Sequence, residues 1–394
     1  MATTQIFPPV AKDHQNEIGS LSVPQRLLLG PGPSNAHPDV LKALALPPVG
    51  HLDPFYVELM SEVQELLRYA WQTHNRITIP MSGTGSAAME ATIANCVEPG
   101  DKFLVAVNGY FGNRLVDMAE RYRADIRTIE KAWGEAFSLE EVEAALQKHR
   151  PAILAMVHAE TSTGVCQPME GIGDLCRKYD CLLLLDTVTS LGGVPLFIDR
   201  WGVDLAYSCS QKGLSCPPGL GPFTISSRAE NKLNARSGKV PNWYLDVSLL
   251  NKYWGSDRVY HHTAPVNMNF GIREALRLLS EEGLENSWNR HASNALKLWE
   301  GLESLGLHLH VDKELRLPTL TTVRIPDGVD GKAFTLYLLK EHGVEIGGGL
   351  GSLAGKVWRI GLMGYNSTSA NVDKVLNLFE SELPRFLDKK SFAA

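Results

Sequence analysis

A carboxylate and a lysine in the middle of the chain are of the types that together support carbonyl–amine chemistry. Asp186 closes the apolar run at residues 182–185, and Lys212 follows it among small and hydroxyl-bearing residues. A lysine shielded from water has a lowered pKa, and its amine can form a Schiff base with an aldehyde. A carboxylate at the end of a buried parallel strand can keep the ring nitrogen of a heterocycle protonated. The pair therefore predicts catalysis with pyridoxal 5'-phosphate, which needs both groups.

Each of these two residues also has a simpler structural interpretation. Asp186 could cap the turn into residues 187–192, and an isolated loop lysine is normally solvated. Lys212, however, lies between the apolar pair at 206–207 and the Cys-Pro-Pro-Gly turn at 216–219. This context, with the aspartate upstream, favours the catalytic interpretation.

A short run of small residues upstream is a candidate phosphate site. Residues 82–86 read Ser-Gly-Thr-Gly-Ser and precede a helix expected at 87–96. Unpaired backbone amides and the positive end of a helix dipole bind phosphate groups. An ordinary helix start explains the same residues equally well. The run differs from a dinucleotide-binding fingerprint, because the third glycine is missing and the preceding strand at 77–79 is short.

Three further residues complete a possible ligand site. A parallel sheet would bring the hydroxyl of Thr161, which follows a strand, beside Asp186 and a cofactor's phenolic oxygen, although an ordinary turn also suits it. Phe111 follows another strand and could stack on a flat ring, although an aromatic there is commonly part of the core. Arg359 could bind a carboxylate bidentately, or it could be half of an ordinary ion pair.

Alternating strand and helix patterns place most of these residues in an α/β domain. Apolar and β-branched runs predict strands at 102–107, 126–129, 152–157, 182–185 and 205–207. Amphipathic stretches between them predict helices at 87–96, 113–122, 138–149 and 172–179, the third opened by a Ser-Leu-Glu-Glu capping box. This order predicts an α/β fold with a mostly parallel sheet covered by helices.

The pattern changes near residue 284 and predicts a second, smaller α+β domain. Helices are expected at 288–305, 331–341 and 370–384, and strands at 320–325 and 357–360. Residues 1–25 are polar and interrupted by prolines, as in an N-terminal arm. The expected organisation is an arm at 1–25, a large domain at 26–283 and a small domain at 284–394.

Composition excludes several other classes of protein. The net charge of −6 gives no electrostatic reason to expect nucleic acid or an anionic membrane as partner. No apolar run approaches the roughly 18 residues of a transmembrane helix, and the first twenty residues do not resemble a signal or transit peptide. The six cysteines show no Cys-x-x-Cys spacing, which is typical of reduced thiols in a reducing compartment. We therefore expect a cytoplasmic protein, with no metal site.

Several motifs, in this order, carry a resemblance to a known family. They are Ser-Gly-Thr-Gly at 82–85, Glu-Thr-Ser-Thr-Gly-Val at 160–165, Asp-Thr-Val-Thr-Ser-Leu-Gly-Gly at 186–193, Ser-Gln-Lys-Gly at 210–213 and Tyr-His-His-Thr at 260–263. The chain resembles the alanine–glyoxylate and serine–pyruvate aminotransferases, which are class V, fold-type I pyridoxal phosphate enzymes. The likeness extends from residue 27 to residue 362, and it implies a homodimer with active sites shared between subunits.

The resemblance assigns roles to individual residues of this sequence. It implies that Lys212 forms the Schiff base, that Asp186 pairs with the pyridine nitrogen, and that Thr161 serves the ring hydroxyl. Phe111 would stack on the ring, where many relatives have tryptophan, and Ser86 stands where several have histidine. The phosphate would be held by Thr84, Gly85, Ser86 and Gln211 of one subunit and by Tyr260 and Thr263 of the other, and the substrate carboxylate by Arg359, with the backbone of Gly32 nearby.

The resemblance also implies the reaction. An amino group would pass from L-alanine or L-serine to glyoxylate, giving pyruvate or hydroxypyruvate and glycine, while Lys212 moves the Cα proton. Class V transaminases acting on 3-hydroxykynurenine, ureidoglycine or an aminophosphonate are alternatives. A desulfurase is disfavoured, because Gln211 stands where such enzymes commonly have histidine and no cysteine lies in a late glycine-rich loop. The alternative outside enzymes is a non-catalytic α/β binding protein.

Overall fold

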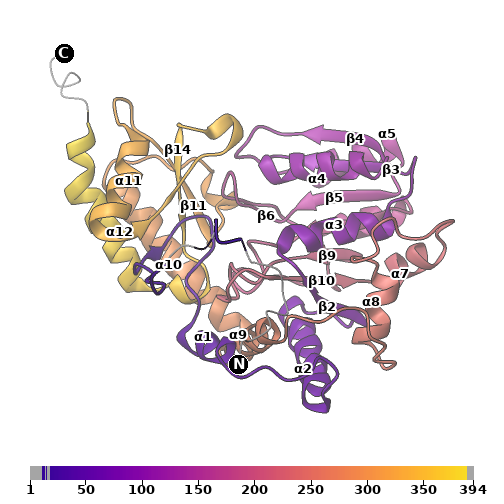
Figure 1. Ribbon diagram of the computed structural model, residues 1–394. Helices are drawn as coiled ribbons and strands as arrows, with labels where there is room; N and C mark the ends of the chain where they lie inside the picture. The colour runs from indigo at the N-terminus through magenta and orange to yellow at the C-terminus, as the bar shows by residue number, and fades with distance from the viewer. Residues whose placement is uncertain (1–10, 14, 16–17, 388–394) are drawn as a thin grey trace, which may run out of the picture.

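A seven-stranded sheet forms the centre of the molecule (Figure 1). The computed structural model describes residues 11–13, 15 and 18–387. Only β10 runs antiparallel to its neighbours, so the sheet is mostly parallel and the predicted α/β fold is confirmed. In spatial order the strands are β2 (Ile77–Ser82), β10 (Leu220–Ile225), β9 (Leu205–Tyr207), β8 (Leu182–Asp186), β5 (Ile153–Val157), β3 (Lys102–Val107) and β4 (Asp125–Glu130).

The central strands are continuous apolar runs because both of their faces are buried. Every residue of β5 and of β8 is buried, which is typical of parallel strands that have helices packed against them. In register, Val157 of β5 lies beside Asp186 of β8, and Asp186 lies beside Tyr207 of β9. The carboxyl ends of three adjacent strands therefore meet at one edge of the sheet.

Nine helices accompany this sheet in the described part of the chain. In Figure 1, α3 and α4 lie over the face turned to the viewer. The predicted capping box of α5 is present, since Ser138 and Glu141 exchange side-chain and backbone hydrogen bonds. The helices are α1 (Pro38–Leu44), α2 (Pro54–Trp71), α3 (Gly85–Cys96), α4 (Tyr110–Arg121), α5 (Leu139–His149), α6 (Ile172–Lys178), α7 (Ser227–Asn234), α8 (Val247–Trp254) and α9 (Val266–Glu282).

Two strands of the sheet differ from the sequence-based expectation. The strand expected at 77–79 continues to Ser82, past Pro80, because β2 is an edge strand, and an edge strand tolerates the missing N–H of proline. The antiparallel strand β10 was not expected, since its Leu-Gly-Pro-Phe-Thr-Ile sequence contains both a glycine and a proline.

A second, three-stranded antiparallel sheet lies in the C-terminal part of the chain. Its order is β11 (Leu320–Arg324), β14 (Val357–Gly361) and β13 (Gly347–Gly348), close to the predicted strands. The predicted helices here are present as α10 (Leu284–Ser304), α11 (Gly331–His342) and α12 (Ser369–Glu382). Helix α10 begins four residues earlier than expected, directly after Gly283, whose φ of 81° ends α9.

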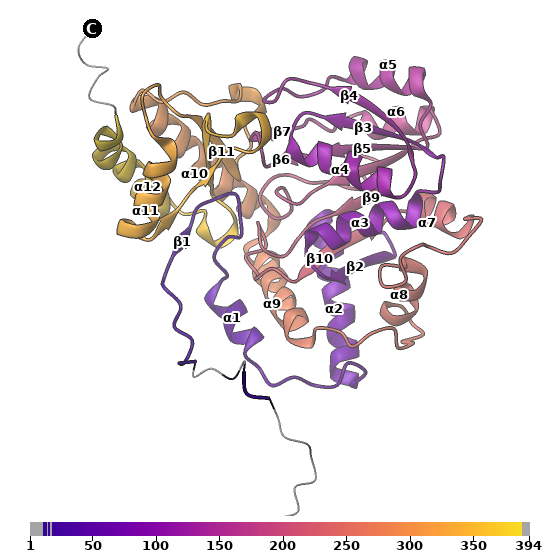
Figure 2. The same cartoon turned by 45° about the horizontal axis from the view of Figure 1, so that its top comes forward.

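The first strand of the chain packs with its last third. Strand β1 (Leu27–Leu28) pairs in parallel with β12 (Val344–Glu345), and Leu29 is fully buried in the core beneath β14. In Figures 1 and 2 the indigo β1 segment lies against the orange and yellow C-terminal elements. Part of the expected arm, residues 1–10, 14, 16 and 17, lies outside the described residues, and the remainder of 11–25 forms no helix or strand.

Two further observations bear on the sequence-based expectations. All six cysteines are free, and five of them are buried, as expected of core thiols. Over residues 11–13, 15 and 18–387, no helix combines the length and the apolar composition that crossing a bilayer would require.

The buried position of Leu29 leads to a stability prediction. Leu29→Ala should lower the free energy of unfolding by about 2–5 kcal/mol, because it leaves a cavity in the C-terminal core. Denaturant-induced unfolding measures this change. Leu336→Ala, at a side chain that is 47% exposed, is the matched control and should cost less than about 1 kcal/mol. Equal effects of the two substitutions would contradict the assignment of Leu29 to that core.

Candidate active site

A cavity of about 210 Å³ opens at the carboxyl edge of the central sheet. It brings together residues from α3, α4 and the ends of β5, β8 and β9, as expected for ligand sites of open α/β sheets. Six of its lining residues were not predicted to belong to the site: Met89, Arg114, Val157, Val188, Tyr207 and Cys209. The predicted residues that line it are Thr84, Gly85, Ser86, Phe111, Thr161, Asp186, Gln211 and Lys212.

The carboxylate of Asp186 is buried at the end of β8 and held by two donors. Its Oδ2 accepts a hydrogen bond from the Tyr207 hydroxyl at 2.6 Å, and its Oδ1 accepts one from the Val188 backbone N–H at 2.8 Å. Burial raises its pKa to about 6, against the opposing effect of these two hydrogen bonds. A cation placed beside this group would therefore favour its ionised form.

The amine of Lys212 points toward the Pro31–Gly32 turn. Its Nζ donates a hydrogen bond to the Pro31 carbonyl oxygen. Burial lowers the pKa of the amine, and the nearby Arg359 charge lowers it further, while Cys209 and Asp186 oppose the shift. Gly32 has a φ of 106°, and a side chain there would collide with the lysine, so only glycine fits. This explains the expected proximity of Gly32 to the site.

The N-terminus of α3 lines the cavity through Thr84, Gly85 and Ser86. Thr84 is its N-cap residue but makes no side-chain capping hydrogen bond. Gly85 packs so closely on the loop after β9 that a β-carbon at position 85 would lie 2.8 Å from Cys209 Cβ. The side-chain Oε1 of Gln211 is buried and has no hydrogen-bond partner among the described residues. The N-terminus of α3, together with the NH2 group of the Gln211 side chain, is a candidate anion site of the kind that holds phosphate.

Phe111, in the first turn of α4, and Thr161, directly after β6 (Ala159–Glu160), both line the cavity. The guanidinium carbon of Arg114 lies 4.8 Å from the centre of the Phe111 ring, on the same helix α4. The Thr161 hydroxyl is hydrogen-bonded to the Thr189 hydroxyl. Phe111 thus has a cation against its ring, and Thr161 is held in place by the loop that follows Asp186.

Glu160 is a structural contributor that sequence reasoning did not single out. Its buried carboxylate accepts hydrogen bonds from the Ser162 N–H at 3.0 Å, the Ser162 hydroxyl at 2.6 Å and the Phe111 N–H at 3.2 Å. Burial raises the pKa of Glu160 to about 7. It caps α4, whose own N-cap residue, Gly109, has no side chain, and so α4 begins three residues earlier than expected. The residues next to the start of α4 do not predict this cap, because Glu160 comes from another strand.

Arg359 lies on β14 and is 5% exposed. Its Nε donates to the Gly348 carbonyl at 2.7 Å and its Nη1 to the Thr161 carbonyl at 3.2 Å. Within the described residues no carboxylate forms an ion pair with it, and burial lowers its pKa to about 10. A buried guanidinium without a carboxylate partner is a candidate receptor for a ligand carboxylate.

Tyr260 and Thr263 do not line this cavity in the single chain. Tyr260 is 54% exposed, and its hydroxyl lies 3.5 Å from the Thr263 hydroxyl oxygen. Between them, His262 Nε2 contacts the Ser82 hydroxyl oxygen at 2.7 Å, and His262 Nδ1 contacts His261 Nδ1 at 2.9 Å. The segment is therefore tied to the start of the Ser-Gly-Thr-Gly-Ser loop, while its tyrosine is directed outward.

Comparisons with known proteins agree on one family. A family model described as aminotransferase class-V matches residues 48–375. The alanine–glyoxylate aminotransferase of Callithrix jacchus is 47% identical over 374 residues, covering 94% of this chain and 90% of that protein. A crystal structure of alanine–glyoxylate aminotransferase from Nostoc sp. matches with a TM-score of 0.94 and 66% identity, covering 95% of this chain and 99% of that one. The (S)-ureidoglycine–glyoxylate transaminase of Bacillus subtilis (strain 168) is 39% identical over 383 residues, covering 93% of this chain and 92% of that protein.

The raised pKa of Asp186 predicts a pH-dependent difference in stability. Its folded-state pKa of about 6 lies above the usual 3.8, so its contribution to stability is complete below about pH 4 and is lost as the pH rises through 6. Without bound cofactor, Asp186→Asn should therefore gain stability relative to the wild type over this interval, by up to about 3 kcal/mol. Denaturant unfolding at a series of pH values measures the difference.

A matched control separates this effect from a general loss of charge. Asp174→Asn removes an aspartate whose side chain is 84% exposed, and its difference from the wild type should stay within about 0.5 kcal/mol. A difference for Asp186→Asn that does not change between pH 4 and 6 would contradict a raised pKa at this carboxyl.

Proposed function

The chain belongs to the class-V aminotransferase family, and from this premise we propose that it moves the amino group of L-alanine, or of L-serine, to glyoxylate. The products are pyruvate, or hydroxypyruvate, and glycine. The observation that carries the proposal is that the buried amine of Lys212 and the buried carboxylate of Asp186 line one cavity, while the buried guanidinium of Arg359, which does not line it, is hydrogen-bonded to the carbonyl of Thr161, which does. The relatives named alanine–glyoxylate aminotransferase support the choice of substrates.

The residues of the cavity fit pyridoxal 5'-phosphate, the cofactor of this family. When bound, the cofactor withdraws electrons from the substrate's Cα bonds. Asp186 would hold the ring nitrogen, Thr161 the ring hydroxyl and Lys212 the aldehyde carbon, while Phe111 and Val188 would contact the ring. Thr84, Gly85, Ser86 and Gln211 would hold the phosphate at the N-terminus of α3, with Gln211 donating through its side-chain NH2 group. The buried Oε1 of Gln211 has no partner among the described residues, and rotation of the amide exchanges the positions of this oxygen and the NH2 group.

Asp186 would stabilise a positive charge on the bound cofactor. Burial raises its pKa to about 6 because the ionised carboxylate is poorly solvated, and a protonated ring nitrogen would provide the cation that this carboxylate lacks. The hydrogen bonds from Tyr207 and Val188 fix the orientation of its oxygens. Fixed dipoles of this kind need no reorganisation as charge develops during the reaction.

Lys212 is the proposed proton acceptor and donor of the reaction. The buried amine of Lys212, whose pKa is lowered, would hold the cofactor's aldehyde carbon; when free, it would accept the proton from the substrate's Cα and donate it to the cofactor carbon on the other side of the amino nitrogen. The Pro31 carbonyl accepts a hydrogen bond from Nζ and so keeps the amine in the cavity. Neither step requires a second titratable side chain.

Arg359 selects substrates that carry a carboxylate next to the reacting carbon. Two of its N–H groups are already bound to the Gly348 and Thr161 carbonyls, which fixes the plane of the guanidinium. A substrate carboxylate would complete the charge pairing that the described residues leave open. Both the amino donor and the keto-acid acceptor carry this group, so one arginine serves both half-reactions.

We infer a cytoplasmic homodimer in which each subunit supplies Tyr260 and Thr263 to the phosphate of the other. Their exposure in the single chain, next to a loop that contacts Ser82, suits a role across an interface. Six free thiols suit a reducing compartment. A monomeric mass by light scattering of the purified enzyme would contradict the shared site, and cell fractionation tests the compartment.

Lys212 is the first residue to test. Borohydride reduction of the purified enzyme should attach the cofactor to Lys212 alone, and peptide mapping identifies the labelled residue. Lys212→Ala should lower kcat by at least about a thousandfold, because the variant loses both the amine and the proton carrier. The control is Lys239→Ala, a lysine outside the cavity, which should keep wild-type activity. A label at any other lysine would overturn the assignment.

Ureidoglycine is the second candidate amino donor, because a named ureidoglycine–glyoxylate transaminase is 39% identical to this chain. A matrix of amino donors against keto-acid acceptors on purified protein separates the two. We expect kcat/KM with L-alanine and glyoxylate to exceed that with ureidoglycine by about tenfold or more, consistent with the higher identity to alanine–glyoxylate enzymes. The reverse ranking would establish the second candidate in place of the first.

A further inference from the structure

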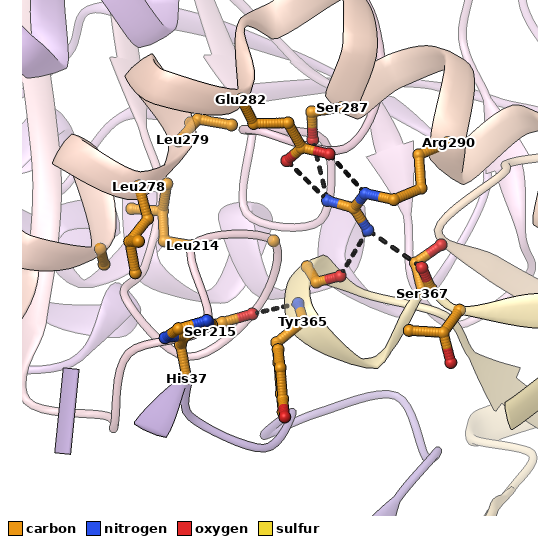
Figure 3. Close-up of a pocket in the computed structure, with 14 residues that line it drawn as sticks. His37, Leu214, Ser215, Leu278, Leu279, Glu282, Ser287, Arg290, Tyr365 and Ser367 are labelled. Atoms are coloured by element: carbon orange, nitrogen blue, oxygen red, sulfur yellow. Dashed lines mark hydrogen bonds and ion pairs between the residues drawn. The ribbon is translucent and has the colours of Figure 1, made fainter. Parts of the chain in front are cut away.

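A second cavity, of about 330 Å³, lies behind the loop that carries Lys212 (Figure 3). One wall is the segment Gly213–Leu214–Ser215, which follows the lysine directly, and another is the turn η3 (Gly364–Asn366), which follows β14 and Arg359. Helices α9 and α10 form the remaining walls. Both the segment that follows Lys212 and the turn that follows Arg359 therefore line this cavity.

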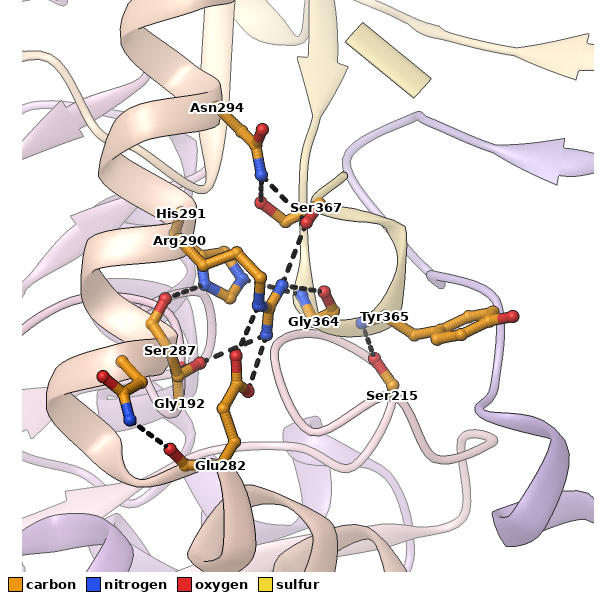
Figure 4. Close-up of polar contacts among 11 residues, drawn as sticks. Gly192, Ser215, Glu282, Ser287, Arg290, His291, Asn294, Gly364, Tyr365 and Ser367 are labelled. Carbon is orange, nitrogen blue, oxygen red and sulfur yellow. Dashed lines mark hydrogen bonds and ion pairs between the residues drawn. The ribbon is translucent and has the colours of Figure 1, made fainter. Parts of the chain in front are cut away.

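The turn η3 is packed tightly on the Lys212 loop. The Tyr365 N–H donates to the Ser215 hydroxyl oxygen at 2.7 Å, a contact visible in Figure 4. Ser215 has a φ of 52°, in the left-handed region that is unfavourable for residues other than glycine. At Gly364 a β-carbon would lie 2.6 Å from the Gly213 carbonyl oxygen. A residue larger than glycine at position 364 would collide with the Lys212 loop. The turn and this loop cannot move apart without loss of the Tyr365–Ser215 hydrogen bond.

Helix α10 holds the same turn from its other side through Arg290. The Nη1 of Arg290 donates to the Gly364 carbonyl at 2.8 Å and to the Ser367 carbonyl at 3.0 Å. Its Nε and Nη2 donate to the two carboxylate oxygens of Glu282 at the end of α9. Figure 4 shows the guanidinium between the Glu282 carboxylate and the turn. One side chain thus bridges α9, α10 and η3.

His291 adds a directional hydrogen bond to the same turn. Its Nδ1 lies 2.7 Å from the Ser287 carbonyl oxygen, which can only accept, so Nδ1 carries the hydrogen. Its Nε2 is therefore free to accept from the Gly364 N–H at 2.8 Å. Asn294 donates to the Ser367 carbonyl at 3.0 Å, one turn further along the helix. These contacts satisfy the polar backbone groups of the turn from one face of α10.

The N-terminal end of α10 is in turn fixed to the large sheet. The Ser287 hydroxyl donates to the Gly192 carbonyl at 2.7 Å, in the loop that follows Asp186. A continuous set of hydrogen bonds therefore runs from the Asp186 loop, through α10, to the turn beyond Arg359 and back to the Lys212 loop. None of the α10 residues in this set lines the 210 Å³ cavity.

We propose that Arg290 and His291 are positioning residues that fix Arg359 relative to Lys212 and so determine the affinity for substrate carboxylates. This inference rests on the proposed function, since it assigns the carboxylate to Arg359. Among the residues expected to contact the cofactor, only Gln211 and Lys212 belong to the loop on which the turn packs, and the others come from separate segments, so loosening the turn should weaken carboxylate binding more than cofactor binding.

The test compares variants of the holoenzyme with propionate, which has the carboxylate of alanine but no amino group. Arg290→Gln should raise the Kd for propionate and the KM for both substrates about tenfold, with kcat changed less than about threefold and cofactor affinity unchanged. His291→Leu should act in the same direction. His291→Gln, whose Oε1 can still accept from the Gly364 N–H, should restore most of the affinity.

Lys297→Gln is the matched control on the same helix. It removes an ion pair with Asp373 and a hydrogen bond to the Ser369 hydroxyl, neither of which involves the turn, so affinity for propionate should stay at the wild-type value. Amide hydrogen exchange of the peptide spanning 362–368, measured without substrate, should accelerate in Arg290→Gln and His291→Leu and stay unchanged in Lys297→Gln.

The outcomes separate this proposal from the proposed function. An enzyme without transaminase activity would overturn the function, while propionate affinity would still decide the role of the two residues. Faster exchange with unchanged propionate affinity would overturn the positioning role, and so would a loss of cofactor affinity equal to the loss of carboxylate affinity. If Arg290→Gln fails to fold, Ser215→Ala removes the single Tyr365 contact and should give a smaller increase in Kd, in the same direction.

Discussion

Burial of ionisable groups at one edge of the sheet is the constraint on which the site depends. Asp186, Glu160, Lys212 and Arg359 lie around one region, and burial shifts the pKa of each toward the neutral form. Such groups reduce folding stability unless donors, acceptors or opposite charges replace the lost water. The strand ends and turns supply part of that replacement as backbone N–H and carbonyl groups. The charges that remain unmatched indicate what a ligand would bring: a cation beside Asp186 and a carboxylate for Arg359.

The sequence predicted best what depends on nearby residues. The apolar run before Asp186, the small residues around Lys212 and the Ser138 capping box are local patterns, and the structure contains all three. The contacts that sequence did not predict join distant segments. Glu160 caps a helix that begins fifty residues earlier in the chain, and Tyr207 reaches Asp186 only because β8 and β9 are neighbours. Whether Arg359 has a carboxylate partner also depends on tertiary packing, which residue type alone does not reveal.

Phe111 illustrates how separate segments fix one residue of the site. The Arg114 guanidinium lies against its ring, and its backbone N–H donates to the Glu160 carboxylate. Phe111 is thus held at its backbone by a cap from another strand and contacted by a cation from the next turn of its own helix. Its position therefore depends on α4 and on β6 (Ala159–Glu160) together.

The pairing of β1 with β12 has a consequence for the order in which the molecule is made. Leu27–Leu29 leaves the ribosome early, but its hydrogen-bond partners at Gly343, Glu345 and Gly361 are translated near the end of the chain. All the strands of the central sheet are synthesised before those partners exist. During synthesis β1 therefore stays unpaired, with its backbone groups hydrogen-bonded to water, while the strands of the large sheet are synthesised and can assemble. Closure of the C-terminal core is consequently a late event that joins the two ends of the nascent chain.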